Sequence, residues 1–395
     1  MQTIESAISS IGRDKFRDEF WDRAVAYIPS SSGHVEEARN LLEKISCFLD
    51  RTDIRYPSLR LVKDGREIPL EDYTRELRIG PHTSHDWVVN ELVFQYYQQG
   101  ATIVLQMLQN SLPSFGNNVN RMEEYFGANV HVSCFITPPG AQGFTAHYDT
   151  YSFFAVQLFG KKQWSLYNST EQLPIRDDRE YEGSWDPVEP ERELTLNVGD
   201  VMYVPRGRYH SALTSTEASV HATVGIFSPN WIDATKAAFA KLHAIPQMRQ
   251  SIASGGEFYS DANLTATPTA LLRSELNLEA GVKSLTDQVF SKHVDARVGR
   301  LHDLLSPSGG RQPQIFMRQS VPHRLEVRNS HAVLQFSNKE IALPVVVYPI
   351  LLAISSKHEN FEILDLPKIL DHRSMQILLG RLVAEGFLRA RAYAC

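Results

Sequence analysis

Cysteine is scarce in this sequence of 395 residues, which contains only Cys47, Cys134 and Cys395. No two of them form a CxxC pair, so the sequence has neither a zinc-ribbon nor a thioredoxin-like redox motif. An odd number of widely spaced cysteines also does not fit the disulfide framework of a small secreted protein. The cysteine content therefore predicts a protein of a reducing compartment.

Long hydrophobic runs and an excess of charge of one sign are also missing. The most apolar stretch, Leu343–Ile354, contains two prolines and is shorter than the roughly 18 residues needed to cross a bilayer. The N-terminal segment is polar and of mixed charge, unlike a secretory signal peptide. The formal net charge of −6 does not indicate a general binder of membranes or nucleic acids. We expect a cytosolic, soluble protein without a membrane partner.

Helical patterns precede a β-rich block. Apolar residues recur at helical spacing in Asp14–Tyr27, in Val35–Leu49 and over the long stretch Asp86–Leu108, which Gly100 could divide into two helices. Pro113–Arg121 is expected to be a loop or the start of a helix. These patterns predict helical elements in the first 128 residues.

From Asn129 to about Trp231 the sequence consists of short β-rich segments separated by Gly, Pro, Asn and Asp. Regular short strands with turn signals between them are typical of a β-sandwich or barrel. The expected strands are Val130–Thr137, Ser152–Phe159, Lys162–Tyr167, Leu194–Leu196, Val201–Val204 and Ala218–Phe227.

Helical spacing returns after this block, in Ala237–Ile245, Leu271–Leu276 and Val282–Leu305. Ser306–Pro313 is a predicted linker. The last part contains strand candidates at Arg324–Arg328 and Ala332–Phe336, helices near Val345–Ser355 and Ser374–Glu385, and a closing strand, a pattern that resembles a winged-helix module. We therefore predict three regions, 1–232, 233–310 and 311–395.

The most informative stretch is TPPGAQGFTAHYDTYSFFAVQLFGKKQWSLY, Thr137 to Tyr167. His147 and Asp149 form an H-x-D pair, and residues two apart on an extended strand point to the same face. A second histidine would complete a two-histidine, one-carboxylate set with three open positions, which is the geometry of non-haem Fe(II) oxygenases. Alone, H-x-D is a weak signal, because a surface turn with a capping Asp has the same letters.

Two histidines could supply the third ligand. His210 follows LNVGDVMYVPRGRY, which predicts a tight turn at Gly199-Asp200, a short strand and a second turn at Gly207. His221 alternates with apolar neighbours, which is typical of a core residue or one that lies behind the ligands. We therefore predict that His147, Asp149 and His210 are the metal ligands and the catalytic centre.

Lys162 is the candidate for binding the second substrate. A barrel oxygenase that uses 2-oxoglutarate needs a buried cation for the far carboxylate. Lys161 and Lys162 are adjacent, so only one of them can face inward on a strand, and Trp164 and Leu166 share the face of Lys162. The alternation predicts that Lys162 points inward; two solvated lysines on a hairpin would be the alternative.

At these residues the chain resembles the JmjC-type ribosomal oxygenases of the cupin-like superfamily. FRDEFW (Phe16–Trp21) is similar to an N-terminal element of that family, and TPPGAQGF, HYD, QLFGKKQW, VGDVMYVPRGRYH and SVHATVGI follow in family order. Each phrase is common by itself, but together they are specific. The resemblance implies mixed α and β structure: a double-stranded β-helix core with N-terminal helices, a helical dimerisation region and a C-terminal winged-helix-like module.

The resemblance also implies roles for single residues. His147, Asp149 and His210 match the iron ligands, Lys162 matches the 2-oxoglutarate-binding cation, and Thr223 matches a residue that lines the same pocket. Ser133 and Phe135 stand where the family commonly has Asn and Tyr, so Ser133 is a further co-substrate candidate while Phe135 lacks a hydroxyl. The cofactor set implied is Fe(II), 2-oxoglutarate and O2, and the assembly implied is a homodimer.

We therefore predict a 2-oxoglutarate-dependent dioxygenase that hydroxylates a side chain of a protein or peptide, with a ribosomal protein as one candidate substrate. A biosynthetic peptide or a small molecule is the alternative substrate. A metal-binding cupin without oxygenase activity and a DNA-reading regulator are alternative functions. The C-terminal region argues against DNA, because its basic and acidic residues nearly balance and form no basic stripe.

A group of acidic residues precedes the Gly199-Asp200 turn. These residues could attract a basic peptide, or they could form an ordinary exposed loop. They are Asp186, Glu189, Glu191 and Glu193.

Overall fold

The computed structural model describes residues 2–168, 172–175, 189–249, 266–291, 315–318, 321–337, 339–357 and 360–390. It divides into two compact units. Unit 1 contains residues 1–123 and 129–227, and unit 2 contains residues 124–128 and 228–395. The predicted linker Ser306–Pro313, Asp186 and Cys395 lie outside the described residues.

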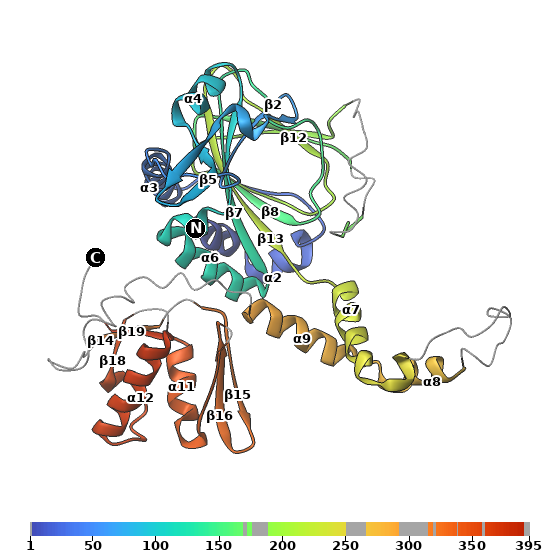
Figure 1. The fold of residues 1–395 in the computed structure, drawn as a ribbon, viewed down its shortest axis with the longest axis vertical. Helices are drawn as coiled ribbons and strands as arrows, with labels where there is room; N and C mark the ends of the chain where they lie inside the picture. The colour runs from blue at the N-terminus through green and yellow to red at the C-terminus, as the bar shows by residue number, and fades with distance from the viewer. Residues whose placement is uncertain are drawn as a thin grey trace. The chain divides into compact units, whose positions relative to one another are not determined.

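A sheet of eight antiparallel strands dominates unit 1 (Figure 1), with β13 between β7 and β8 in the middle. The register is continuous along β7, from Asn129 opposite Phe227 to Thr137 opposite Ser219. In sheet order the strands are β1 (Ala26–Ile28), β11 (Val201–Val204), β8 (Ser152–Phe159), β13 (Ser219–Phe227), β7 (Asn129–Thr137), β6 (Thr102–Leu105), β2 (Leu59–Lys63) and β3 (Arg66–Glu67).

A second sheet of three strands has the order β10 (Arg192–Leu196), β9 (Lys162–Leu166) and β12 (His210–Leu213). A buried apolar cluster joins it to the large sheet. Phe153 and Ala155 of β8 pack with Trp164 and Leu166 of β9. The two sheets therefore enclose one interior, as expected for a double-stranded β-helix. The cluster is completed by Leu196, Met202 and Val204.

Helices cover the other face of the large sheet. Side chains from α1 (Gln2–Ile11), α3 (Ser32–Leu49) and α6 (Pro113–Phe126) line one small internal space with residues of β7, β8 and β13. Alternation along β7 separates the two environments, because Val132 and Cys134 are buried on the helical side while Ser133 and Phe135 face the interior between the sheets. Unit 1 also contains α2 (Arg13–Lys15), η1 (Phe16–Phe20), η2 (Leu70–Asp72), α4 (Asn90–Gln98), α5 (Leu108–Ser111), and the hairpin β4 (Thr74–Ile79) and β5 (His82–Val88).

The strands expected in the β-rich block are confirmed, as are the helix at Val35–Leu49 and the helix start at Pro113. The prediction for Asp86–Leu108 is wrong. This stretch contains the end of β5, the single helix α4 and the strand β6, with Gly100 in the left-handed region at φ 99°. The apolar run Ile103–Leu105 is fully buried because it pairs with both β2 and β7, and a short buried run of this kind cannot be distinguished from a helix by spacing.

The helix expected over Asp14–Tyr27 is only partly present. The helical turns of α2 and η1 end at Phe20, and β1 begins at Ala26. Asp22 has φ 55°, a left-handed conformation that a helix cannot contain. Phe16 is buried against Phe154 and Tyr203, so contacts with distant strands decide the path of the chain here.

Unit 2 begins with the helical pair α7 (Trp231–Lys241) and α9 (Leu278–Ser291), with η4 (Leu242–Ala244), η5 (Pro246–Arg249) and α8 (Ala266–Glu275) between them. Asn230 and Asp233 form a capping box at the start of α7. Gly281 of α9 lies against Ala234 and Ala238 of α7, and a β-carbon there would stand 2.2 Å from the Ala234 carbonyl oxygen. The close approach of the two helices therefore requires glycine at this position.

The C-terminal part of unit 2 has its own apolar core beneath α11 (Tyr348–Ser355) and α12 (His372–Glu385). It contains the meander β15 (His323–Arg328), β16 (His331–Phe336) and β17 (Lys339–Pro344), the sheet β18 (Phe361–Glu362), β14 (Ile315–Arg318) and β19 (Leu388–Ala390), and the turns η7 (Val345–Val347) and η8 (Ile363–Asp365). The expected strands and helices of this region are confirmed.

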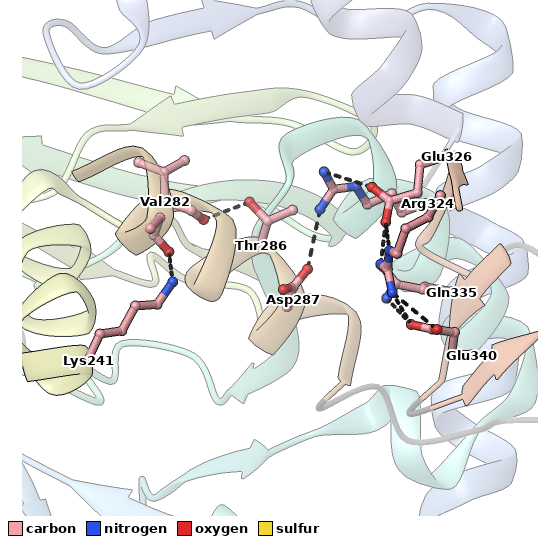
Figure 2. Close-up of polar contacts among 10 residues, drawn as sticks. Lys241, Val282, Thr286, Asp287, Arg324, Glu326, Gln335 and Glu340 are labelled. Atoms are coloured by element: carbon pink, nitrogen blue, oxygen red, sulfur yellow. Dashed lines mark hydrogen bonds and ion pairs between the residues drawn. The ribbon is translucent and has the colours of Figure 1, made fainter. Parts of the chain in front are cut away.

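A chain of ion pairs connects α9 to the meander (Figure 2). One guanidinium nitrogen of Arg324 on β15 lies 3.5 Å from a carboxylate oxygen of Asp287 on α9, and another lies 3.3 Å from a carboxylate oxygen of Glu326. A guanidinium nitrogen of Arg328 lies 3.1 Å from a carboxylate oxygen of Glu340 on β17. These side chains are between 22% and 46% exposed, so water screens each pair and its contribution to stability is small.

Candidate metal centre

Three side chains of unit 1 form a group that could hold a metal ion. His147 and Asp149 come from the segment between β7 and β8, and His210 begins β12. One ligand atom of each lies within 4.8 Å of the others. The backbones of His147 and His210 form an isolated bridge, with N–H···O distances of 3.1 and 2.8 Å in the two directions.

The two imidazoles are oriented for metal binding. The Nδ1 atom of His147 lies 2.8 Å from the carbonyl oxygen of Thr145, and that of His210 lies 3.0 Å from the carbonyl oxygen of Arg208. A carbonyl oxygen only accepts, so each Nδ1 carries the hydrogen and each Nε2 keeps its lone pair. The Nε2 atom of His210 is 3.8 Å from a carboxylate oxygen of Asp149. Burial, together with the nearby His147, lowers the pKa of His210 to about 3, so this ring is a neutral ligand.

Aromatic rings surround the histidines. The ring centroids of Phe153 and Trp164 lie 5.1 and 5.8 Å from that of His210, and Phe144 lies 5.7 Å from His147. Apolar walls of this kind keep water from the ligand atoms.

Lys162 is buried in the same interior. Its side chain is 2% exposed, and Nζ donates a hydrogen bond of 3.1 Å to Oγ1 of Thr137. Burial lowers its pKa from 10.5 to about 8. Lys161 is exposed, so the direction expected from the alternation along β9 is confirmed. Among the described residues, no carboxylate is paired with Lys162, which leaves its positive charge available to an anion.

Ser133 and Thr223 are cross-strand partners on β7 and β13. Both are half-buried, on the face that also presents Phe135 and His221. Their side chains therefore face the interior between the sheets, and contact with a co-substrate stays a prediction for both.

His221 does not belong to the metal-capable group found among the described residues, which contains His210. Its ring stacks on Phe135 with a centroid distance of 4.9 Å and meets the ring of Trp164 edge-on at 5.3 Å. The expectation that His221 lies behind the ligands agrees with this placement.

Sequence reasoning missed one pair of residues at this site. Asp22 accepts hydrogen bonds from Arg206 at 3.0 Å and from Ser152 at 3.2 Å. The next residue after Arg206, Gly207, donates its backbone N–H to the carbonyl oxygen of Asp149 at 2.9 Å. The N-terminal segment therefore holds the turn that supports a predicted metal ligand, although 184 residues separate Asp22 from Arg206.

Replacing Asp22 with asparagine is expected to weaken metal binding about tenfold, at the lower end of the roughly 10- to 100-fold cost of altering groups behind metal ligands. Asparagine tolerates the left-handed backbone at this position, so the change removes mainly the charge that pairs with Arg206. Cobalt(II) titration followed by absorbance measures the affinity. Asp53→Asn, which breaks the exposed pair with Arg51, is the matched control. Equal affinities for both variants would refute the supporting role.

The described acidic residues before the Gly199-Asp200 turn are only partly available to a ligand. Glu191 forms an ion pair with Arg208, two residues before His210, while Glu189 and Glu193 are exposed. The charge of Glu191 is thus largely compensated within the chain.

Comparisons with known proteins agree with this geometry. A family model described as "JmjC domain" matches residues 106–234. The "Bifunctional lysine-specific demethylase and histidyl-hydroxylase NO66" of Culex quinquefasciatus is 28% identical over 319 residues, 74% of this chain and 46% of that protein. "Ribosomal oxygenase 1" of Gallus gallus is 35% identical over 174 residues, 43% of this chain and 29% of that protein.

Residues 106–234 are similar to the JmjC domain, and the relatives matched over parts of this chain include ribosomal oxygenases. Among solved structures, the Escherichia coli ribosomal oxygenase YcfD matches with a TM-score of 0.56 at 14% identity, over 96% of this chain and 98% of that one. That likeness shows the JmjC/cupin fold predicted from the sequence. The chain spans about half or less of the length of the curated relatives it matches. In the described part of this chain, no helix has the length and apolar character needed to cross a membrane.

Proposed function

We propose that this chain is an Fe(II)- and 2-oxoglutarate-dependent oxygenase that hydroxylates an amino-acid side chain of a protein or peptide. The observation that carries the proposal is the pairing of two features in one interior: the group of His147, Asp149 and His210, and the buried cation of Lys162. A metal-binding cupin without oxygenase activity has no need of a buried, unpaired lysine beside its metal.

The three ligand candidates fit a ferrous ion. Two neutral imidazoles and one carboxylate on one face leave open positions for a second substrate and for O2. The iron, when bound, would supply the oxidation in which O2 and 2-oxoglutarate convert a C–H bond into C–OH, with succinate and CO2 as the other products. His147 and His210 would bind through Nε2 and Asp149 through a carboxylate oxygen, while the rings of Phe144, Phe153 and Trp164 exclude water.

Lys162 would bind the far carboxylate of 2-oxoglutarate, with Thr223 and Ser133 lining the space between. The solved YcfD structures support 2-oxoglutarate as the co-substrate, since one of them holds cobalt and 2-oxoglutarate. The names of the curated relatives support a protein substrate, because they include a histidyl-hydroxylase and a ribosomal oxygenase. A ribosomal protein is therefore the first substrate to test.

A biosynthetic peptide or a small molecule is the second candidate substrate. The observation that favours it is the pair Ser133 and Phe135, where the family resemblance implies Asn and Tyr. These two residues face the interior, so a different group could be accommodated there.

Reconstitution with Fe(II) and 2-oxoglutarate tests the proposal. Under air, the protein should convert 2-oxoglutarate to succinate and add the mass of one oxygen atom to a substrate from a ribosomal-protein extract or a peptide library. Products from only the peptide library would favour the second substrate class. Absence of both the mass gain and succinate, with iron shown to be bound, would contradict the oxygenase assignment.

We also propose that α7 and α9 form a homodimer interface and that the C-terminal part of unit 2 is a winged-helix-like module. Large apolar side chains on α7 and α9 are exposed, among them Trp231 at 73% and Ile232 at 50%. Exposed apolar groups gathered on one helical pair are typical of an association surface. The division into the three regions 1–232, 233–310 and 311–395 stays a prediction.

Replacing Trp231 with glutamate is expected to raise the dimer dissociation constant at least tenfold, because burying one large apolar side chain contributes about 1.5–3 kcal/mol. Sedimentation velocity across a concentration series measures the constant. Ile377→Glu is the matched control, since Ile377 on α12 is also exposed, at 66%. A wild-type protein that is monomeric throughout the series would disprove the dimer.

A further inference from the structure

His221 is a buried histidine that the proposed mechanism does not yet use. It stands opposite Phe135 in the ladder between β13 and β7, and the two rings are nearly parallel, with an interplanar angle of 8°. The ring of Trp164 meets it at 76°. The imidazole is therefore fixed between two aromatic side chains in the interior of the barrel.

Two side chains beside Lys162, those of His221 and Trp164, each have a buried ring nitrogen that lacks a hydrogen-bond partner within the described part of the chain. Nδ1 of His221 and Nε1 of Trp164 are buried, and neither has a hydrogen-bond partner among the residues that the structure describes. A buried polar atom without a partner is costly, and native proteins rarely contain two side by side. Their occurrence next to Lys162 indicates a site for a ligand that accepts hydrogen bonds.

The ladder positions place His221 near the end of the site where Lys162 lies. Ser219 stands opposite Thr137, whose hydroxyl accepts from the Lys162 amine. The pair of His221 and Phe135 follows two residues further along the strands, roughly 7 Å away. Lys162 and His210 are both close enough to affect the pKa of His221. The ring of Trp164 is close to both His221 and His210, so His221 lies within one interior with Lys162 and the metal centre.

The protonation state of His221 suits a donor. Burial lowers the pKa of His221 well below the ordinary value, and the nearby positive charge of Lys162 lowers it further. The ring is therefore neutral at physiological pH, carries one N–H, and does not repel the lysine.

We propose that His221 donates a hydrogen bond to the far carboxylate of 2-oxoglutarate, beside Lys162, and replaces the hydroxyl that Phe135 lacks. This inference rests on the proposed function. It assigns a contact with 2-oxoglutarate to His221, in addition to the predicted residues Lys162, Thr223 and Ser133. The resemblance implies Tyr at position 135, where its hydroxyl would supply a polar contact. Here the stacked imidazole supplies that contact from the neighbouring strand.

Binding of two ligands to the cobalt(II)-loaded protein tests the inference by calorimetry. 2-Oxoglutarate is compared with 2-oxopentanoate, which keeps the metal-chelating end and five carbons but has a methyl group in place of the far carboxylate. His221→Phe keeps an aromatic ring against Phe135 and removes the N–H. We expect this variant to bind 2-oxoglutarate about 10- to 100-fold more weakly, the usual value of a hydrogen bond to a charged group. Its affinity for 2-oxopentanoate and for cobalt should change less than about twofold.

A second variant tests the replacement of the hydroxyl. Adding Phe135→Tyr to His221→Phe should recover part of the lost affinity for 2-oxoglutarate. Equal losses for both ligands, no loss for either, or failure of the double variant to recover would each overturn the inference. A wild-type protein that does not prefer 2-oxoglutarate over 2-oxopentanoate would instead refute the proposed function, so the two failures are distinguishable.

Discussion

Replacing His147 with alanine is expected to reduce hydroxylation at least a hundredfold. Changing a group behind a metal ligand already costs about 10- to 100-fold, and His147 is itself a proposed ligand. Its Nε2 is available to the metal because Nδ1 donates a hydrogen bond to the Thr145 carbonyl oxygen. Asp149→Ala is expected to have the same effect, because the set then loses its only carboxylate.

The stability that the protein gains on binding metal provides a second test of the role of His147. At a metal concentration about 100 times Kd, binding to the folded state alone adds about 2.7 kcal/mol to the free energy of unfolding. Cobalt(II) should therefore raise the thermal midpoint of the wild type and leave that of His147→Ala unchanged. His82→Ala, which removes an exposed histidine of β5, is the matched control and should behave as the wild type. Full activity in His147→Ala would refute the ligand assignment.

The β-rich block could be predicted because its signals are local. Alternation of buried and exposed residues has a period of two along a strand, and Gly and Pro mark the turns. The same alternation distinguished Lys162 from Lys161 without knowledge of the partner strand, and the structure buries the first and exposes the second. The phrase that precedes His210 likewise contains its own turns, so its position at the start of β12 follows from neighbours in sequence.

Features that depend on distant residues could not be predicted. The strand β6 is a strand only because β2 and β7 flank it, and its apolar run fits a helix equally well by spacing. Asp22 forms an ion pair with Arg206, which lies 184 residues later in the chain. No pattern in the sequence around Asp22 indicates that contact. The stack of His221 on Phe135 depends on the register of two strands that are far apart in sequence. A single sequence contains the apolar pattern of each strand but not its pairing.

Replacing Lys162 with methionine is expected to weaken 2-oxoglutarate binding more than a hundredfold while metal affinity stays the same. Removing one partner of a buried ion pair costs about 3–5 kcal/mol, because the carboxylate is then buried without its cation. Calorimetry with the cobalt-loaded protein measures this, and Lys161→Met, at the exposed neighbouring position, should bind as the wild type. Unchanged affinity in Lys162→Met would remove Lys162 from the co-substrate site.

The pKa of Lys162 makes the same binding step depend on pH. The charged amine is needed for the carboxylate, and in the free protein the pKa is about 8. Affinity for 2-oxoglutarate should be nearly constant below that pH and fall about tenfold between pH 7 and pH 9 as the proton is lost. Lys162→Arg keeps its charge over this range, so its affinity should not fall in the same way. A pH-independent wild type would contradict the role of the lysine charge.

Lys162→Met should also make the ligand-free protein more stable, which separates a functional lysine from a structural one. Burial lowers the Lys162 pKa from 10.5 to about 8, so the folded protein holds its proton less tightly than the unfolded chain does. The charged lysine therefore destabilises the fold by roughly 3 kcal/mol below pH 8, and this cost disappears as the pH rises from about 8 to 10.5. Methionine fills a similar volume without charge, so denaturant unfolding at pH 7 should show a gain for the variant that shrinks at pH 10. A lysine whose removal stabilises the fold and abolishes co-substrate binding is kept for the anion it binds. Destabilisation by Lys162→Met at pH 7 would instead make Lys162 a structural residue.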